Sequence, residues 1–299
     1  MVDMSTTGDW ESYSEDEQRY HAKRMAVYAG MIDAMDHHLG RLVAFLKETG
    51  QYDNTIFIFT SDNGSEASGG DDPRSLPMRA ALWWQGYVND YDTLGQKGSF
   101  NAIGPSFASA AASPLDFYKF YAGEGGMRVP LIIAGEPIPT TARLTNAFAY
   151  VTDITPTILD VAGVNPPSGR FGGRPVESII GRSLLPLVRG DVERVYSATD
   201  TIGYELGGNA ALFQGDYKIV LNIPPVGDNQ WHLYNIVTDP GETDDLKEHM
   251  PERFQEMLAH YRQYVIDNDV LPLPANYDPV FQGVANGVLD RFGLQILVG

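Results

Sequence analysis

The chain has 299 residues, of which 43% are hydrophobic and 20% are charged, so it is long enough to bury a substantial core. Its 39 acidic and 21 basic residues give a formal net charge of −18, which argues against a nucleic-acid partner because phosphates require a basic surface. Cysteine is absent, which excludes disulfides, zinc–thiolate sites and a cysteine nucleophile, and no apolar run approaches the ~18 residues of a membrane-spanning helix.

The first predicted element is a long helix that begins after Ser14. Ser14 and Glu17 have the spacing of a capping box, and hydrophobic residues then recur at helical spacing as far as Leu46. Gly50 is the predicted stop. A continuously apolar strand follows at 54–60. A long helix that leads into such a strand predicts an α/β fold with a mostly parallel sheet covered by helices on both faces.

The middle of the chain alternates a long irregular stretch with further α/β elements. Residues 65–114 are rich in Gly, Ser, Ala and Asp and are predicted to form a functional loop. A second buried strand is predicted at 129–134. A helix is predicted from about 154, with Asp153 as its N-cap and Gly163 at its end.

The pattern changes near residue 195. Short β-like runs separated by turn residues, followed by a helix near 251–267, predict a small antiparallel sheet packed by one helix. We therefore expect an α/β domain over 1–194, a small antiparallel subdomain over 195–270 and a tail over 271–299.

The stretch "TIFIFTSDNGS" places an acid and an amide directly after the first predicted strand. Open α/β sheets bind ligands beyond the carboxyl ends of their strands. Asp62 and Asn63 both offer oxygen, the donor that calcium and magnesium prefer. The alternative is an ordinary turn, because Asp, Asn and Gly are common turn formers.

Five stretches, in this order and spacing, resemble the formylglycine-dependent sulfatases of the alkaline phosphatase superfamily, and the bacterial aryl- and alkylsulfatases in particular. They are "MIDAMDHHLGRLVAFLKETGQYDNTIFIFTSDNG", "GEGGMRVPLIIAG", "VTDITPTILDVAG", "GRSLLP" and "QWHLYNIVTDPGETDDL". The resemblance runs from the helix at 15 to about 268.

The resemblance implies a role for three residues. Asp62 and Asn63 would bind a divalent cation, calcium with magnesium as the alternative. Lys119 would contact the sulfate oxygens and stabilise the negative charge that develops as the S–O bond breaks. Glu124 would hold the loop, and the glycines that follow it would permit a backbone conformation closed to other residues.

The family's remaining catalytic groups have no match in the chain. Its formylglycine nucleophile is made in a Cys/Ser-x-Pro/Ala-x-Arg signature, which this sequence lacks. We therefore expect the chain to correspond to the carboxyl-terminal portion of such an enzyme, to need the missing N-terminal half as a partner and to be inactive alone. A bacterial cytoplasmic or periplasmic location is left open, because any signal peptide would lie on the absent part.

The implied activity of the intact protein is that of a sulfuric ester hydrolase, which converts a sulfate monoester to an alcohol or phenol plus sulfate. One alternative stays in the superfamily, as a phosphonate monoester or phosphodiester hydrolase with a similar metal site. The other is a non-catalytic sulfatase remnant that serves as a binding or assembly module.

Overall fold

The computed structural model describes residues 7–69, 74, 76–135, 138, 144–224 and 226–274. These residues form two compact units. The long-helix unit comprises Gly8–Ala108 and Arg128–Asp200, and the sheet unit comprises Ser109–Met127 together with the described part of Thr201–Gly299. The predicted tail lies outside the described residues from 275 onward.

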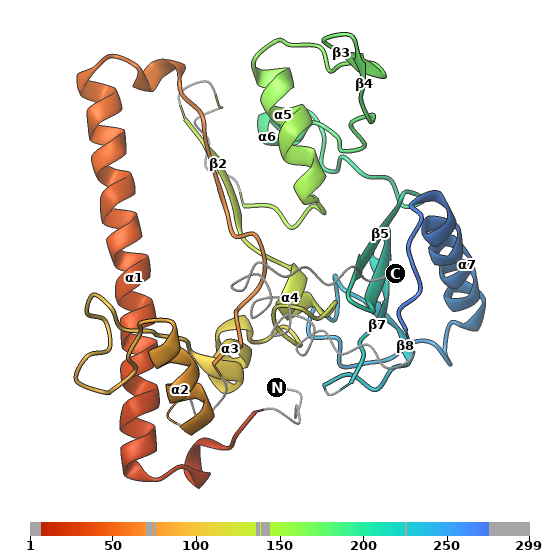
Figure 1. Cartoon of the computed structure of the whole chain (residues 1–299). Helices are drawn as coiled ribbons and strands as arrows, with labels where there is room; N and C mark the ends of the chain where they lie inside the picture. Colours follow the sequence, from red (N-terminus) through yellow and green to blue (C-terminus); the bar gives the residue numbers. More distant parts are fainter. Residues whose placement is uncertain are drawn as a thin grey trace. The chain divides into compact units, whose positions relative to one another are not determined.

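The long-helix unit contains α1 (Glu15–Glu48), β1 (Phe57–Thr60), α2 (Leu76–Trp84), β2 (Leu131–Ala134), α5 (Ile154–Val161), β3 (Arg170–Phe171), β4 (Arg174–Pro175) and α6 (Leu185–Arg189) (Figure 1). Helix α3 (Gly104–Ala112) runs from this unit into the sheet unit, which contains α4 (Glu124–Met127), β5 (Thr201–Leu206), β6 (Asn209–Gln214), β7 (Tyr217–Leu221), β8 (Trp231–Asn235) and α7 (Pro251–Asp267). Among the described residues, the helices are too short or too polar to cross a membrane.

The predicted start and end of α1 are confirmed. The Ser14 side chain caps the helix, and Glu17 Oε2 accepts a hydrogen bond from the Ser14 N–H at 2.8 Å, which completes the capping box. Beyond Glu48 the chain turns at Gly50, whose φ is +66°. Local side-chain chemistry is sufficient to fix both ends of this helix.

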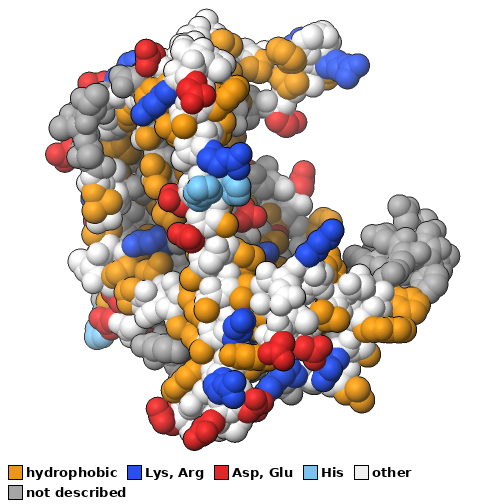
Figure 2. All heavy atoms as spheres, turned by 90° about the vertical axis from the view of Figure 1, so that its left-hand side faces the viewer, with side chains coloured by type: hydrophobic (Ala, Val, Ile, Leu, Met, Phe, Trp, Pro, Cys, Tyr) orange, Lys and Arg blue, Asp and Glu red, His pale blue; other side chains and the backbone are white. Residues whose placement is uncertain are grey.

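Most of α1 is not packed against the described parts of its own unit. Its buried residues are confined to the first third of the helix: Tyr20, His21 and Arg24. Large hydrophobic side chains farther along are 39–56% exposed: Met31, Ile32, Met35, Leu39, Leu42 and Phe45. We call these six residues the α1 stripe. On the side of the molecule that Figure 2 shows, hydrophobic side chains are exposed next to charged and histidine side chains.

Strands β1 and β2 pair with each other, but not in the predicted parallel manner. They are antiparallel, with Phe57 opposite Ala134 and Thr60 opposite Leu131. A continuously apolar run predicts a strand covered on both faces, but β2 is mostly exposed, so the prediction of a buried second strand was wrong for the described residues. The run also does not specify the direction of the neighbouring strand. Asp62 and Asn63 follow the last residue of β1, at the end of the two-stranded sheet where β2 begins.

The prediction of a long loop over 65–114 was wrong in part, since α2 and α3 lie within it. Helix α3 has the sequence GPSFASAAA. Its small residues suggested a loop, yet alanine is the strongest helix former and proline is tolerated in a first helical turn.

The predicted antiparallel sheet with a packed helix is confirmed. Strands β5–β6–β7–β8 form a four-stranded antiparallel sheet in sequence order. Leu212, Ile219 and Leu233 from three of these strands pack with Met257 of α7, and all four are 0–1% exposed. Burial of these side chains joins the helix to the sheet.

The helix predicted from 154 is α5, and Gly163 lies just beyond its end with a φ of +66°. Asp153 does not cap it through its side chain. Its carboxylate instead accepts hydrogen bonds from the Tyr150 N–H at 2.7 Å, the Arg182 N–H at 2.8 Å and the Tyr196 hydroxyl at 2.5 Å. A fully buried carboxylate needs several donors, and here one local donor and two distant ones take the place of a cap on α5.

Candidate functional site

The segment after β1 is both a turn and a pair of oxygen donors. Ser61 Oγ donates to the Asn63 carbonyl at 2.7 Å, and Asn63 Nδ2 donates to the Gly64 carbonyl at 2.9 Å. These local bonds are those of a turn. Within the described residues, no ion pair holds the exposed Asp62 carboxylate. The two predicted ligands therefore lie side by side, directly beyond the strand.

A divalent cation fits the type of these donors but not their number. Calcium takes ~6–8 oxygen ligands, whereas one carboxylate and one amide oxygen supply about two or three. The described residues contain no cluster of three or more His, Asp or Glu side chains that is arranged to hold a metal ion. A cation site built on Asp62 and Asn63 would therefore need further donors besides these two side chains.

Lys119 lies in the sheet unit, on a loop that connects α3 to α4. Its side chain is half-buried, with Nζ 5.2 Å from the centre of the Phe120 ring, a cation–π distance. Asp62 and Asn63 lie in the long-helix unit. Each unit is described by itself, so the predicted convergence of the three residues stays a prediction.

Glycines hold the Lys119 loop by close approach, not by an unusual conformation. The Gly125 N–H donates to the Asp116 carbonyl at 2.6 Å, and a Cβ at Gly125 would lie 2.3 Å from the Phe117 carbonyl oxygen. A Cβ at Gly126 would lie 2.4 Å from the Tyr121 carbonyl oxygen. Neither glycine has a positive φ, so the expectation of a special conformation was wrong and steric exclusion is the reason for glycine here.

The sheet unit contains a buried ion group, formed by Lys218, Glu124 and Glu242, that was not predicted from the sequence. Lys218 Nζ is 2.8 Å from Glu242 Oε1 and 3.1 Å from Glu124 Oε1, and Glu242 Oε2 accepts a hydrogen bond from the Glu124 N–H at 2.7 Å. Burial favours a neutral amine, but the charges of Glu242 and Glu124 outweigh it and raise the pKa of Lys218. Burial also raises the pKa of Glu242, against the charge of Lys218.

The ion group fixes the position of Glu124 and hence of the loop that precedes it. Lys218 is fully buried, and its removal would leave two carboxylates without their counter-ion. Glu124 therefore has the structural role that was expected of it. A signal existed in the sequence: "YKIVL" is a buried-strand pattern interrupted by one lysine.

A third acid lies within the Lys119 loop. Asp116 is 8% exposed, and its Oδ1 accepts a hydrogen bond from the Phe117 N–H at 2.8 Å. Burial raises the pKa of Asp116 to about 6, against the hydrogen bond from Phe117 and the charge of Lys218, which lower it. The loop thus carries a group that titrates below neutral pH.

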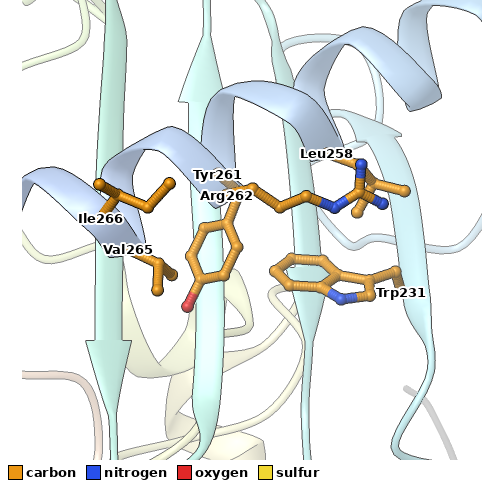
Figure 3. Close-up of a pocket in the computed structure, with 6 residues that line it drawn as sticks. All are labelled: Trp231, Leu258, Tyr261, Arg262, Val265 and Ile266. Carbon is orange, nitrogen blue, oxygen red and sulfur yellow. The ribbon is translucent and has the colours of Figure 1, made fainter. Parts of the chain in front are cut away.

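The sheet unit also has an apolar pocket between β8 and α7 (Figure 3). It is lined by Trp231, Leu258, Tyr261, Arg262, Val265 and Ile266. None of the three predicted site residues lines it, and its lining contains no acidic side chain.

Comparison with known proteins identifies the family. The Sulfatase family model matches residues 5–164, a range that includes Asp62, Asn63 and Lys119. The chain is 33% identical to an uncharacterized sulfatase of Schizosaccharomyces pombe over 278 residues, which cover 92% of this chain and 49% of that protein. It is 34% identical to the arylsulfatase of Klebsiella aerogenes over 177 residues, which cover 59% of this chain and 37% of that protein.

The chain also resembles a solved structure in its fold. The solved structure of Ps i-CgsB in complex with k-i-k-neocarrahexaose superposes with a TM-score of 0.57 at 22% identity, over 95% of this chain and 50% of that chain. This likeness confirms the predicted alkaline-phosphatase-like α/β fold. The chain spans about half of the length, or less, of the proteins it matches. On the family model and the extended identity to a sulfatase relative, the chain belongs to the sulfatase family.

Proposed function

We propose that this chain is the part of a sulfuric ester hydrolase that carries two cation ligands and a sulfate-binding lysine. The intact enzyme hydrolyses a sulfate monoester to an alcohol or phenol plus sulfate. The observation that carries the proposal is the Sulfatase family match, which spans all three predicted site residues. The arylsulfatase relative supports an aryl sulfate as the first substrate to test.

Lys119 has the chemistry for binding the transferred group. Its ammonium donates hydrogen bonds to sulfate oxygens and stabilises negative charge on the leaving oxygen as the S–O bond breaks. The loop backbone that carries it is held by Gly125 and by the buried ion group, so the charge is presented from a fixed support. Removal of one such donor from an active site typically costs ~10²–10³ in kcat.

Asp62 and Asn63 hold the cation in this proposal, calcium with magnesium as the alternative. A cation held by these two side chains would polarise the sulfate, and the nucleophile would be a formylglycine that this sequence does not contain. The Asp62 carboxylate contributes negative charge to the cation site, and the Asn63 amide contributes a neutral oxygen. The Asn63 side chain is held in the turn that follows β1 by its bond to the Gly64 carbonyl.

The remaining half of the site comes from a partner, which we propose is a polypeptide equivalent to the unmatched part of the relatives. Two observations support this. The chain covers 49% of the S. pombe sulfatase, and its own ligands fall short of a full calcium shell. The exposed α1 stripe offers an apolar surface on which such a polypeptide could pack.

The test is hydrolysis of p-nitrophenyl sulfate by the chain, alone and with a polypeptide that carries a formylglycine-modified Cys-x-Pro-x-Arg segment. We expect no turnover by the chain alone and turnover by the pair. Lys119→Ala should lower kcat of the pair by about 10²-fold. Lys97→Ala is the matched control, because Lys97 is exposed and has no assigned role.

Other outcomes point to the rivals. Hydrolysis by the chain alone, above the Lys119→Ala background, would overturn the proposal. Faster turnover of a phosphonate monoester or phosphodiester by the pair would favour that class of hydrolase. A chain that binds the polypeptide and hydrolyses none of these esters would be a non-catalytic module.

Calcium binding gives a separate check. Titration calorimetry of the chain alone should show Ca²⁺ binding weaker than about 10⁻³ M, because too few ligands are present. With the partner polypeptide the affinity should rise, and Asp62→Asn should lower it again. Tight binding by the chain alone, unchanged in Asp62→Asn, would show that the cation site lies elsewhere.

A further inference from the structure

The Lys119 loop is conformationally strained on both sides of the lysine. Phe117 has a φ of +63° and Phe120 a φ of +81°. A bulky non-glycine residue rarely adopts a positive φ, and each such residue costs on the order of 1–3 kcal/mol. Strain of this kind persists only where the surroundings fix the backbone.

Two buried asparagines bind the loop directly after Lys119. Asn209, at the start of β6, is 5% exposed; its Nδ2 donates to the Phe120 carbonyl and its Oδ1 accepts from the Ile223 N–H, both at 2.9 Å. Asn222, just beyond β7, is 4% exposed, and its Oδ1 accepts from the Ala122 N–H at 2.7 Å. The backbone on either side of residue 121 is thus bonded to the sheet.

The two asparagines use different chemistry. Asn222 acts on the loop as an acceptor, which an aspartate can imitate. Asn209 acts as a donor to a carbonyl and at the same time as an acceptor for another backbone group, which an aspartate cannot reproduce. This difference separates a specific positioning role from general packing.

We propose that Asn209 and Asn222 are positioning residues for Lys119. They hold the strained turn at Phe120–Ala122, and so fix the backbone from which the lysine side chain extends. A lysine has a long flexible stem, so a fixed backbone removes part of the freedom that sulfate binding would otherwise have to restrict. The inference rests on the proposed role of Lys119 for its catalytic meaning, but its structural content does not depend on activity.

The experiment uses the full chain and two readouts that do not require turnover. Hydrogen exchange reports on the Ala122 amide, and competitive acetylation with acetic anhydride reports on the reactivity of Lys119 relative to Lys97. The variants are Asn222→Ala, Asn222→Asp and Asn209→Asp. The control is Asn235→Ala, at the end of β8, whose side chain accepts from the Val237 and Thr238 N–H groups and, among the described residues, forms no hydrogen bond with the loop.

Asn222→Ala should speed exchange at Ala122 about tenfold, the effect of losing one buried hydrogen bond. It should also change the acetylation rate of Lys119. Asn222→Asp should restore both values, because the acceptor is retained. Asn209→Asp should change both the exchange rate at Ala122 and the acetylation rate of Lys119, because the donor to the Phe120 carbonyl is lost. Asn235→Ala should leave both unchanged.

Equal values in Asn222→Ala and Asn235→Ala would overturn the proposal. So would faster exchange throughout β5–β8 in Asn222→Ala, since that would show a general loosening of the sheet. If Asn222→Ala does not fold, the comparison of Asn222→Asp with Asn209→Asp tests the proposal. Equal changes of Ala122 exchange and Lys119 acetylation in these two variants would overturn it. If the intact enzyme hydrolyses sulfate esters equally well without Lys119, the proposed role of Lys119 fails while these exchange results stand.

Discussion

At the scale of single residues, Asp116 makes the Lys119 loop sensitive to pH. Burial raises the pKa of this carboxyl to about 6. The unfolded chain has an aspartate pKa of about 3.9, so the folded state binds the proton more tightly. The resulting stability is fully present below about pH 4 and is lost as the pH rises to about 6.

Replacement of Asp116 by Asn should remove this dependence. Between pH 4 and pH 7, the free energy of unfolding of the wild type should fall by about 2 kcal/mol relative to Asp116→Asn, after allowance for solvent around a partly exposed carboxyl. Urea denaturation at both pH values measures the difference. The exposed Asp92→Asn is the control, and a difference that does not change with pH would contradict the assignment.

The ion pairs of Lys218 could not be predicted from its own position in the sequence. Its partners Glu124 and Glu242 lie 94 positions before it and 24 after it in the chain, and their pairing follows from the fold. The sequence shows a lysine within an apolar strand, but the residues near it in sequence do not indicate which carboxylates pair with it. Asp62 and Asn63 follow the predicted strand in the structure, as expected from the sequence, and their role as cation ligands stays a prediction.

At the scale of elements, two glycines have opposite roles. A Cβ at Gly125 would lie 2.3 Å from a carbonyl oxygen, whereas a Cβ at Gly30, in the middle of α1, would meet nothing within 4 Å. Gly125→Ala should therefore lower the free energy of unfolding by at least about 2 kcal/mol. Gly30→Ala should raise it by about 0.5–1 kcal/mol, because alanine is the better helix former.

Urea denaturation of the full chain followed by circular dichroism measures both glycine variants. The two act as controls for each other, since each replaces the same hydrogen with the same methyl group. Equal stability of Gly125→Ala and the wild type would show that the loop does not need the close approach.

The elements that were predicted well have strong local signals. The capping box of α1 and the turn-separated runs of β5–β8 depend on neighbours in sequence, and both are confirmed. Helix α3 was missed because its small residues were grouped with the Gly- and Ser-rich stretch around them, although its alanines favour a helix. The direction of β1 relative to β2 was missed because it depends on which strand comes to lie beside it.

At the scale of the whole molecule, the α1 stripe is an exposed apolar surface that the described part of its own unit does not cover. Ile32, Met35, Leu39 and Leu42 repeat at intervals of four and three, which places them on one side of the helix. Exposed apolar stripes of this kind mark interaction surfaces. We expect the chain alone to self-associate through it, and the partner polypeptide to cover it.

The double variant Met35→Glu with Leu39→Glu tests this surface. Light scattering should show less self-association, and affinity for the partner polypeptide should fall at least about tenfold, a change of about 1.4 kcal/mol. Ala44→Glu is the control, because Ala44 is exposed on the opposite side of α1. Equal effects of the double variant and of Ala44→Glu would show that added charge, and not loss of the stripe, is responsible.

The hydrogen bonds that hold the Lys119 loop also set the order of events during synthesis. The hydrogen bond from the Ala122 N–H requires Asn222, which is synthesised 100 residues later. The hydrogen bond from the Glu124 N–H requires Glu242, which is synthesised 118 residues later. At a ribosomal rate of about 5–20 residues per second, the loop emerges roughly 5–20 s before its supports exist. The Lys119 loop is therefore expected to reach its final form only when the last strands have been translated, which makes it one of the latest parts of the chain to mature.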